Sequence, residues 1–137
     1  MPERTTVQKA KRELRRGKSP TTAAGEFVHE EIKHIRQGKH GARSTKQAIA
    51  IGLSKARRAG VPLKPPARGE VSERTRRSAE AAYEVGQGKR KPRTTSRRRA
   101  RAVSGALKRE RHQVVSKRAL SRQAKQAAAR RKRRGRR

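Results

Sequence analysis

The chain has 137 residues and a formal net charge of +32, from 42 Lys or Arg against 10 acidic residues, while 29% of it is hydrophobic and 1% aromatic. This composition offers too little apolar material for a core in proportion to its length or for a membrane-spanning segment. It predicts a mainly α protein without a β-sheet, in which a small helical unit carries basic extensions, partly disordered or conditionally helical. Like charges at this density repel one another, so a polyanion such as nucleic acid is the expected partner.

The first predicted helix lies in the basic N-terminal segment, residues 1–18. Val7, Ala10 and Leu14 recur at helical spacing and share one narrow face. Gly17 follows this stretch, and glycine is common just beyond the end of a helix. We expect an amphipathic helix that can add a third member to the hairpin after it.

An αα-hairpin is predicted over residues 19–61, with helices at about 22–37 and 45–59. Ser44 and Gln47 form a capping-box pattern at the start of the second helix. The connection between the helices has a length that joins antiparallel neighbours. We therefore expect the two helices to lie side by side.

Each helix of the hairpin has one apolar face. Projection at 100° per residue places Glu30 on the polar side of the first helix and Ile51 on the outer side of the second, where it is a candidate homodimer contact. The two apolar faces are expected to pack against each other. They consist of Val28, Ile32 and Ile35 in the first helix and of Ile49, Leu53 and Ala56 in the second.

The rest of the chain is more basic. Residues 62–71 read as a proline-rich linker, 72–86 as a short helix and 87–137 as a basic tail. Residues 89–137 contain 22 Lys or Arg against one Glu, so we expect this tail to be partly helical and to gain helix on a polyanion. Gly105 is the position expected to weaken its middle.

The sequence contains one motif that suggests an enzyme, HEEIKH at residues 29–34. Zinc proteases place two His at i and i+4 on one helical face, whereas His29 and His34 are five positions apart. The sequence also lacks a complete phosphate-binding loop and a recognisable pairing of nucleophile and base. We expect a protein that is not an enzyme and has no metal or cofactor.

Few residues are suited to reading bases. Phe27 and Tyr83 are the only aromatic residues, and the outer face of the second hairpin helix offers base edges little beyond Gln47, Lys55 and Arg58. A sequence-reading helix-turn-helix is an alternative, but its turn would be longer than usual. The preferred interpretation is sequence-independent binding to the phosphate backbone.

The stretch KHGARSTKQAIAIGLSKARRAG, with the upstream GEFVHEEIKHIRQG, resembles a family of small, highly basic bacterial proteins that share an uncharacterised domain. Some of its members are described as DNA-binding. The resemblance covers roughly residues 1–65 and implies DNA binding without assigning residues to it. The tail, with RRRARAVSGALKRE and RALSRQAKQAAARR, is similar in composition to the extensions of bacterial histone-like and linker-histone-like proteins.

The sequence therefore predicts a cytoplasmic, nucleoid-associated protein that binds or compacts DNA without sequence preference, with DNA favoured over RNA. An RNA- or ribosome-associated protein and a protein-interaction module with an electrostatic anchor are alternatives, and a homodimer through the hairpin is a further expectation. No membrane insertion is expected. The residues predicted to contact phosphates are Lys55, Arg57, Arg58, Lys89, Arg90, Lys91, Arg93, Arg97, Arg98, Arg99, Arg101, Lys108, Arg109, Arg111, Lys117, Arg118, Arg122, Lys125, Arg130, Arg131, Lys132, Arg133, Arg134, Arg136 and Arg137.

Overall fold

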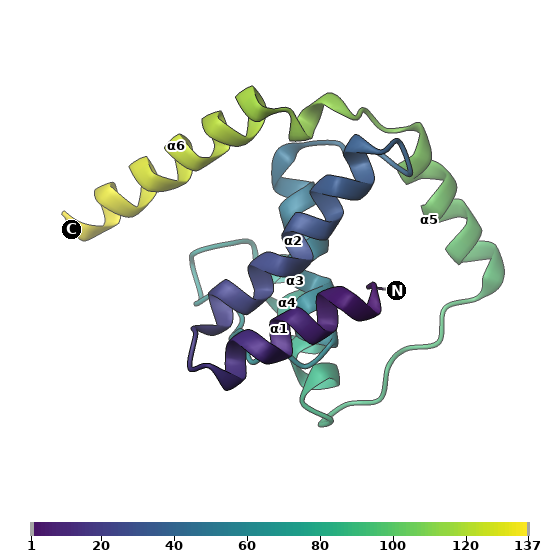
Figure 1. The fold of residues 1–137 in the computed structure, drawn as a ribbon, viewed down its shortest axis with the longest axis horizontal. Helices are drawn as coiled ribbons and strands as arrows, with labels where there is room; N and C mark the ends of the chain where they lie inside the picture. The colour runs from purple at the N-terminus through teal and green to yellow at the C-terminus, as the bar shows by residue number, and fades with distance from the viewer. Residues whose placement is uncertain (1, 137) are drawn as a thin grey trace. The chain divides into compact units, whose positions relative to one another are not determined.

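The computed structural model describes residues 2–136 and is mainly α-helical (Figure 1). The described residues form no strand, which confirms the predicted fold class, and no helix among them is long and apolar enough to cross a bilayer. The helices are α1 (Arg4–Arg15), α2 (Pro20–Arg36), α3 (Thr45–Arg58), α4 (Glu73–Gly86), α5 (Arg97–Arg109) and α6 (Lys117–Gly135), with a 3-10 turn, η1 (Gln113–Val115), before α6.

Ser44 and Gln47, the two residues predicted to cap the start of α3, both accept capping hydrogen bonds, but Gln47 has a different donor from the one expected. The Ser44 Oγ accepts a hydrogen bond from the Gln47 backbone N–H at 3.1 Å, as a capping box requires. The Gln47 Oε1 accepts from the backbone N–H of Arg43 at 2.6 Å, one residue before the expected donor. Both side chains therefore satisfy backbone N–H groups around the first turn of the helix.

The end of α3 is set by a glycine in the left-handed region. Gly60 has φ +102°, and the Val61 backbone N–H donates to the Ala56 carbonyl at 3.1 Å. This pattern closes the last turn and reverses the chain, and a residue with a side chain adopts that φ rarely. The same arrangement ends three other helices, at Gly17, Gly38 and Gly88.

The chain divides into two compact units that share α2 and α3. Unit 1 comprises residues 1–31 and 50–95, and unit 2 comprises residues 32–49 and 96–137. The hairpin predicted over residues 19–61 is therefore not a separate unit, because each of its helices contributes one part to unit 1 and the other to unit 2.

Unit 1 has a core of small side chains around one aromatic ring. Figure 1 shows α1 lying across the first part of α2, where Val7 and Leu14 pack as predicted. Phe27 is fully buried at the centre, although the sequence did not single it out as a core residue. The other buried members of this core are Ala10, Ala23, Ala24, Ala56 and Val61.

The contact between α2 and α3 in unit 1 depends on Gly52. A Cβ at this position would lie 2.6 Å from the Val28 Cα, a distance that real Cβ atoms essentially never show. The absence of a side chain thus lets the two backbones approach closely. Leu53 packs beside this contact against the unit 1 core, as the predicted apolar face requires.

The start of the proline-rich segment after α3 packs against the core of unit 1. Val61 is buried and Leu63 contacts the core. The last turn of α4 also lies on the end of α3, where a Cβ on Gly86 would lie 1.7 Å from the Arg57 carbonyl oxygen. The ends of α3 and α4 are therefore in direct contact.

Unit 2 has a second, smaller core. Ile35, Ala42, Ala48 and Val115 are buried in it, with Ile32 and Val114 packed against them. Val115 belongs to the segment predicted to be a basic tail. That segment was not expected to contribute a residue to a core. This burial fixes one part of the tail to the neighbourhood of the α2–α3 connection.

The helical break in the tail lies elsewhere than expected. Gly105 falls inside α5, whereas the helix ends at Arg109. A new helix starts after Ser116, whose Oγ accepts a hydrogen bond from the Ala119 backbone N–H at 3.1 Å. Residues 110–116 break the helix because Val114 and Val115 turn into the unit 2 core.

Candidate nucleic-acid interface

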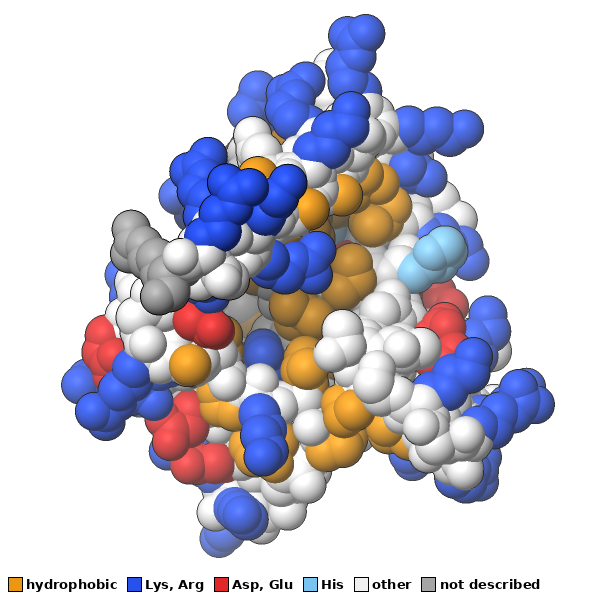
Figure 2. Space-filling model, turned by 90° about the vertical axis from the view of Figure 1, so that its left-hand side faces the viewer, with side chains coloured by type: hydrophobic (Ala, Val, Ile, Leu, Met, Phe, Trp, Pro, Cys, Tyr) orange, Lys and Arg blue, Asp and Glu red, His pale blue; other side chains and the backbone are white. Residues whose placement is uncertain are grey.

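Charge is divided unequally between the two units. Unit 1 contains nine of the ten glutamates, whereas unit 2 has Glu110 as its single acid and 23 Lys or Arg, for a net +22 over 60 residues. Figure 2 shows Lys and Arg side chains spread widely over the visible face, with acidic side chains in a few separate places. Unit 2 is therefore the part of the chain with the strongest attraction for a polyanion.

Helices α5 and α6 present dense rows of exposed cations. Six of the 13 residues of α5 and nine of the 19 of α6 are Lys or Arg, and neither helix contains an acid or a buried residue. Side chains at these positions can follow a phosphate backbone. Serine caps at Ser96 and Ser116 start the two helices.

Residues 107–115 attach these basic helices to the unit 2 core. The Leu107 carbonyl accepts a hydrogen bond from the Gly41 backbone N–H at 2.8 Å, and the Arg111 carbonyl accepts from Ala42 at 2.9 Å. A Cβ on Gly41 would lie 2.0 Å from the Glu110 carbonyl oxygen, so this crossing requires glycine. The α2–α3 connection is thus a docking point for the tail.

Side chains reinforce the same attachment. The Thr45 hydroxyl donates to the Val114 carbonyl at 2.6 Å, and the His112 Nδ1–H donates to the Ile35 carbonyl at 3.2 Å. The Arg36 guanidinium donates to the Val115 carbonyl. Sequence reasoning missed this set, and the only local signals were the adjacent valines and a serine able to cap a new helix.

Most of the predicted phosphate-binding residues are exposed. Arg90 is exposed and also pairs with Glu84, at 2.7 Å between Nη2 and Oε2. Arg137 lies outside the described residues. The exposed set comprises Arg58, Lys89, Arg90, Lys91, Arg93, Arg97, Arg98, Arg99, Arg101, Lys108, Arg109, Arg111, Lys117, Arg118, Arg122, Lys125, Arg130, Arg131, Lys132, Arg133, Arg134 and Arg136.

Arg57 is a correction to the predicted interface. It is only 7% exposed, and its guanidinium donates from Nε to the Leu63 carbonyl at 3.1 Å and from Nη2 to the Lys64 carbonyl at 3.3 Å. Burial lowers the pKa of this guanidinium, yet arginine stays charged in proteins. The charge holds the proline-rich segment and is not available to a phosphate.

Lys55 is a second correction. Its Nζ forms an ion pair with the fully buried carboxylate of Glu31. Taking a lone carboxylate out of water is costly, so this lysine compensates a charge inside the helix pair. Three cations at the end of α3 were predicted to contact phosphates, and of these only Arg58 is exposed.

Glu30, predicted on the polar face of its helix, is also buried, at 3% exposure. Its Oε1 accepts a hydrogen bond from the Glu3 backbone N–H at 2.7 Å, just before α1 begins. The carboxylate therefore connects the start of α1 to α2. Helical periodicity cannot show this, because the partner lies 27 positions away.

Glu26 and Glu13 form a carboxyl pair between α2 and α1. Burial, followed by a hydrogen bond to Glu13 and the repulsion of its charge, raises the pKa of Glu26, while Lys9 and His29 lower it to a smaller extent. Shared hydrogen bonding between two carboxyl groups favours the protonated form of one of them. This contact in unit 1 is therefore sensitive to pH.

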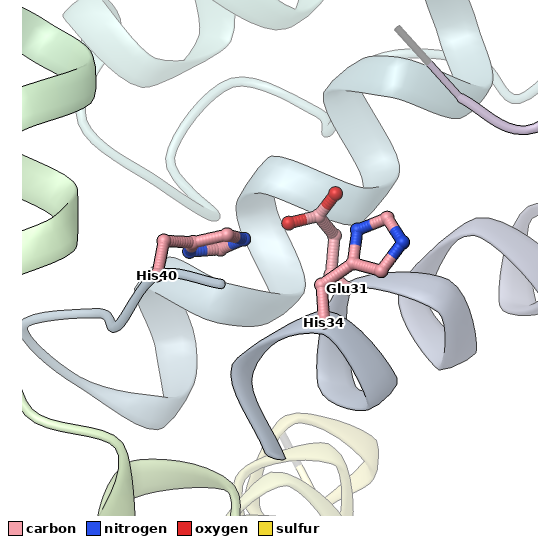
Figure 3. Close-up of side chains that lie close together, drawn as sticks. All are labelled: Glu31, His34 and His40. Carbon is pink, nitrogen blue, oxygen red and sulfur yellow. The ribbon is translucent and has the colours of Figure 1, made fainter. Parts of the chain in front are cut away.

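A ring nitrogen of His34 and one of His40, both in unit 2, lie within 4.8 Å of each other. His29 is exposed, and Figure 3 shows His34 on α2 and His40 in the loop that follows, with Glu31 one helical turn before His34. The His40 Nδ1–H donates to the Gly41 carbonyl at 2.9 Å. Since Lys55 neutralises Glu31, we assign this carboxylate a structural role.

No protein-family model, curated protein or solved structure matches this chain.

Proposed function

We propose that the protein binds nucleic acid, preferably duplex DNA, through sequence-independent contacts between the Lys and Arg of unit 2 and phosphates. The observation that carries this proposal is the pair of acid-free helices α5 and α6, on which every Lys and Arg is exposed. Cations in this density repel one another unless phosphates neutralise them, and the release of counterions then drives binding.

The form of α6 favours duplex DNA over duplex RNA. A helix of this length extends roughly 28 Å and has a diameter that the major groove of B-form DNA accepts. The major groove of A-form RNA is too narrow for it. Since α6 and α5 belong to one unit anchored at residues 107–115, a single chain can contact phosphates at two places, which suits a DNA-compacting protein.

Binding to fluorescent duplexes of one sequence and of its scrambled versions tests the proposal. Affinities should agree within about twofold among the duplexes, because phosphates carry no sequence information. They should fall steeply between low and high salt. Strong preference for one duplex would overturn the sequence-independent mode, and stronger binding to structured RNA in direct competition would overturn the preference for DNA.

A further inference from the structure

Unit 1 has a groove of about 450 Å³ beside the proline-rich segment. Pro65 and Pro66 line it together with Tyr83 of α4, and Lys64 and Lys89 are also at the groove. Its volume lies within the range of small-molecule sites in proteins. Its lining combines flat apolar groups with cations. The basic helices of unit 2 do not offer this combination.

The wall of this groove is fixed by the buried Arg57. Its hydrogen bonds to the carbonyls of Leu63 and Lys64 hold the chain immediately before the prolines. The close contact of Gly86 with Arg57 holds the last turn of α4 against the same point. The prolines themselves restrict the backbone, so the groove is preformed and binding does not have to order it.

The charges around the groove leave it attractive to anions. Arg76 is shared between Glu73 at 2.6 Å and Glu80 at 3.4 Å, and Glu84 is paired with Arg90 at 2.7 Å. The groove lining still holds four cations against two acids, a net charge of +2. Lys64, Arg68 and Lys89 are exposed cations among the residues that line it. An anionic ligand with a flat apolar part is thus complementary to both the charge and the walls.

We propose that this groove binds one unpaired nucleotide of a single-stranded nucleic acid, its base stacked on Tyr83 and its flanking phosphates at Lys64 and Lys89. The inference rests on the proposed function, because it takes nucleic acid as the partner. Stacking on an aromatic ring serves every base and needs no sequence readout. Phe27 is fully buried, so Tyr83 is the aromatic side chain that can supply it. Bases inside a duplex are already stacked, so duplex binding through unit 2 does not use the groove.

The fluorescence of the full chain reports on this groove directly, since Tyr83 is the only tyrosine and there is no tryptophan. We would titrate the chain with short oligo(dT), short oligo(rU), a duplex of equal charge and inorganic tripolyphosphate, correcting for absorption with N-acetyltyrosinamide. Saturable quenching by the single strands is expected, with little change from the duplex or tripolyphosphate. The oligo(dT) and oligo(rU) arms distinguish DNA from RNA as the source of the nucleotide. Equal quenching by tripolyphosphate, or none by bound single strands, would overturn base stacking.

Variants separate the ring from the charge. Tyr83→Ala should weaken single-strand binding roughly fivefold to a hundredfold and leave duplex binding within twofold, whereas Tyr83→Phe should bind like the parent. The double variant Lys64→Gln and Lys89→Gln changes two exposed positions and should also weaken single-strand binding. It tests the groove independently if Tyr83→Ala does not fold. Lys11→Gln with Lys18→Gln changes two exposed lysines of unit 1 that do not line the groove, and this matched control should keep the ratio of the two affinities.

The two proposals fail in different ways. If Tyr83→Ala and the double variant at Lys64 and Lys89 bind single strands as the parent does, while salt-dependent duplex binding persists, the groove assignment is wrong and the proposed function stands. If neither duplex nor single strand binds with steep salt dependence, the proposed function is wrong, and the groove assignment falls with it.

Discussion

The guanidinium of Arg36 donates two hydrogen bonds to the carbonyl oxygen of Val115, from Nε at 3.2 Å and from Nη2 at 3.0 Å. The two residues are 79 positions apart, and Val115 lies at the junction between α5 and α6. One arginine at the end of α2 therefore fixes the point from which α5 and α6, the two helices proposed to bind phosphates, extend. Arg36 is thus a basic residue with a structural role, because its hydrogen bonds stabilise the fold.

Arg36→Gln should loosen that junction. It removes hydrogen bonds from a charged donor, which contribute about 1.5–3 kcal/mol, and weakens the tie on Val115. Hydrogen exchange of the backbone amides in residues 107–116, followed by mass spectrometry, should become several-fold faster. Arg43→Gln, at an exposed arginine of the same unit, should leave that exchange unchanged. Equal protection in both variants would contradict the anchoring role.

Gly52→Ala should destabilise unit 1, because its Cβ would meet the Val28 backbone. Overpacking of this kind costs about 1–3 kcal/mol. Gly25→Ala is the matched control, as this glycine also lies inside a helix but has nothing within 4 Å of an added Cβ. There the gain in helix propensity should stabilise by about 0.5–1 kcal/mol. Chemical denaturation of both variants measures the contrast, and a Gly52→Ala protein as stable as Gly25→Ala would refute the close packing of α2 on α3.

Arg57→Gln and Arg58→Gln should have opposite consequences. Loss of the buried guanidinium should lower the free energy of unfolding by about 2 kcal/mol, since two carbonyls lose a charged donor. Below its melting temperature this variant should bind duplex DNA as the parent does. Arg58→Gln should keep the parent's melting temperature and bind DNA slightly more weakly, because its side chain is exposed. Thermal melts and DNA titrations on both proteins are the measurements, and reduced DNA affinity in folded Arg57→Gln would count against its structural assignment.

Glu26→Gln should stabilise unit 1 more at neutral than at acidic pH. The raised pKa of Glu26 means that the folded state holds more protons than the unfolded state between the ordinary and the raised pKa. Stability from this carboxyl group is therefore fully present below its unfolded pKa and is lost as pH rises through the folded pKa. Glutamine does not ionise, so the difference in melting temperature between variant and parent should grow from pH 4 to pH 7.

Glu13→Gln provides a second test of that pair. It removes the hydrogen-bonded partner and the like charge that raise the pKa of Glu26. The parent's loss of stability with rising pH should then become smaller. A melting-temperature difference for Glu26→Gln that is the same at pH 4 and pH 7 would rule out the proposed titration.

Local signals in the sequence predicted much of the helical framework. Ser44, Gln47 and Gly60 set the ends of α3 through contacts within a few residues, and the spacing of Val7, Ala10 and Leu14 indicated the buried side of α1. Such features depend on helix geometry and backbone hydrogen bonds close in sequence. They are therefore visible without knowledge of the tertiary fold.

Long-range partners explain what the sequence did not predict. Glu31 and Arg57 have the residue types of a solvated surface, yet they are buried because Lys55 and the carbonyls after α3 meet them in space. Val115 is one apolar residue in a basic tail, and the α2–α3 connection is what buries it. The groove at Tyr83 likewise needs the proline-rich segment to fold back beside α4.

The most direct test of the central claim is the salt dependence of duplex binding in two matched variants. Replacing Arg130, Arg131, Lys132 and Arg133 of α6 by Gln should reduce the slope of log K against log salt by roughly three to four, at about 0.9 for each phosphate that the variant no longer neutralises. The control replaces four exposed cations of α1, namely Arg4, Lys11, Arg12 and Arg15, and should change the slope by less than about one. An equal decrease of the slope in both variants, or an unchanged slope in the α6 variant, would contradict binding through unit 2.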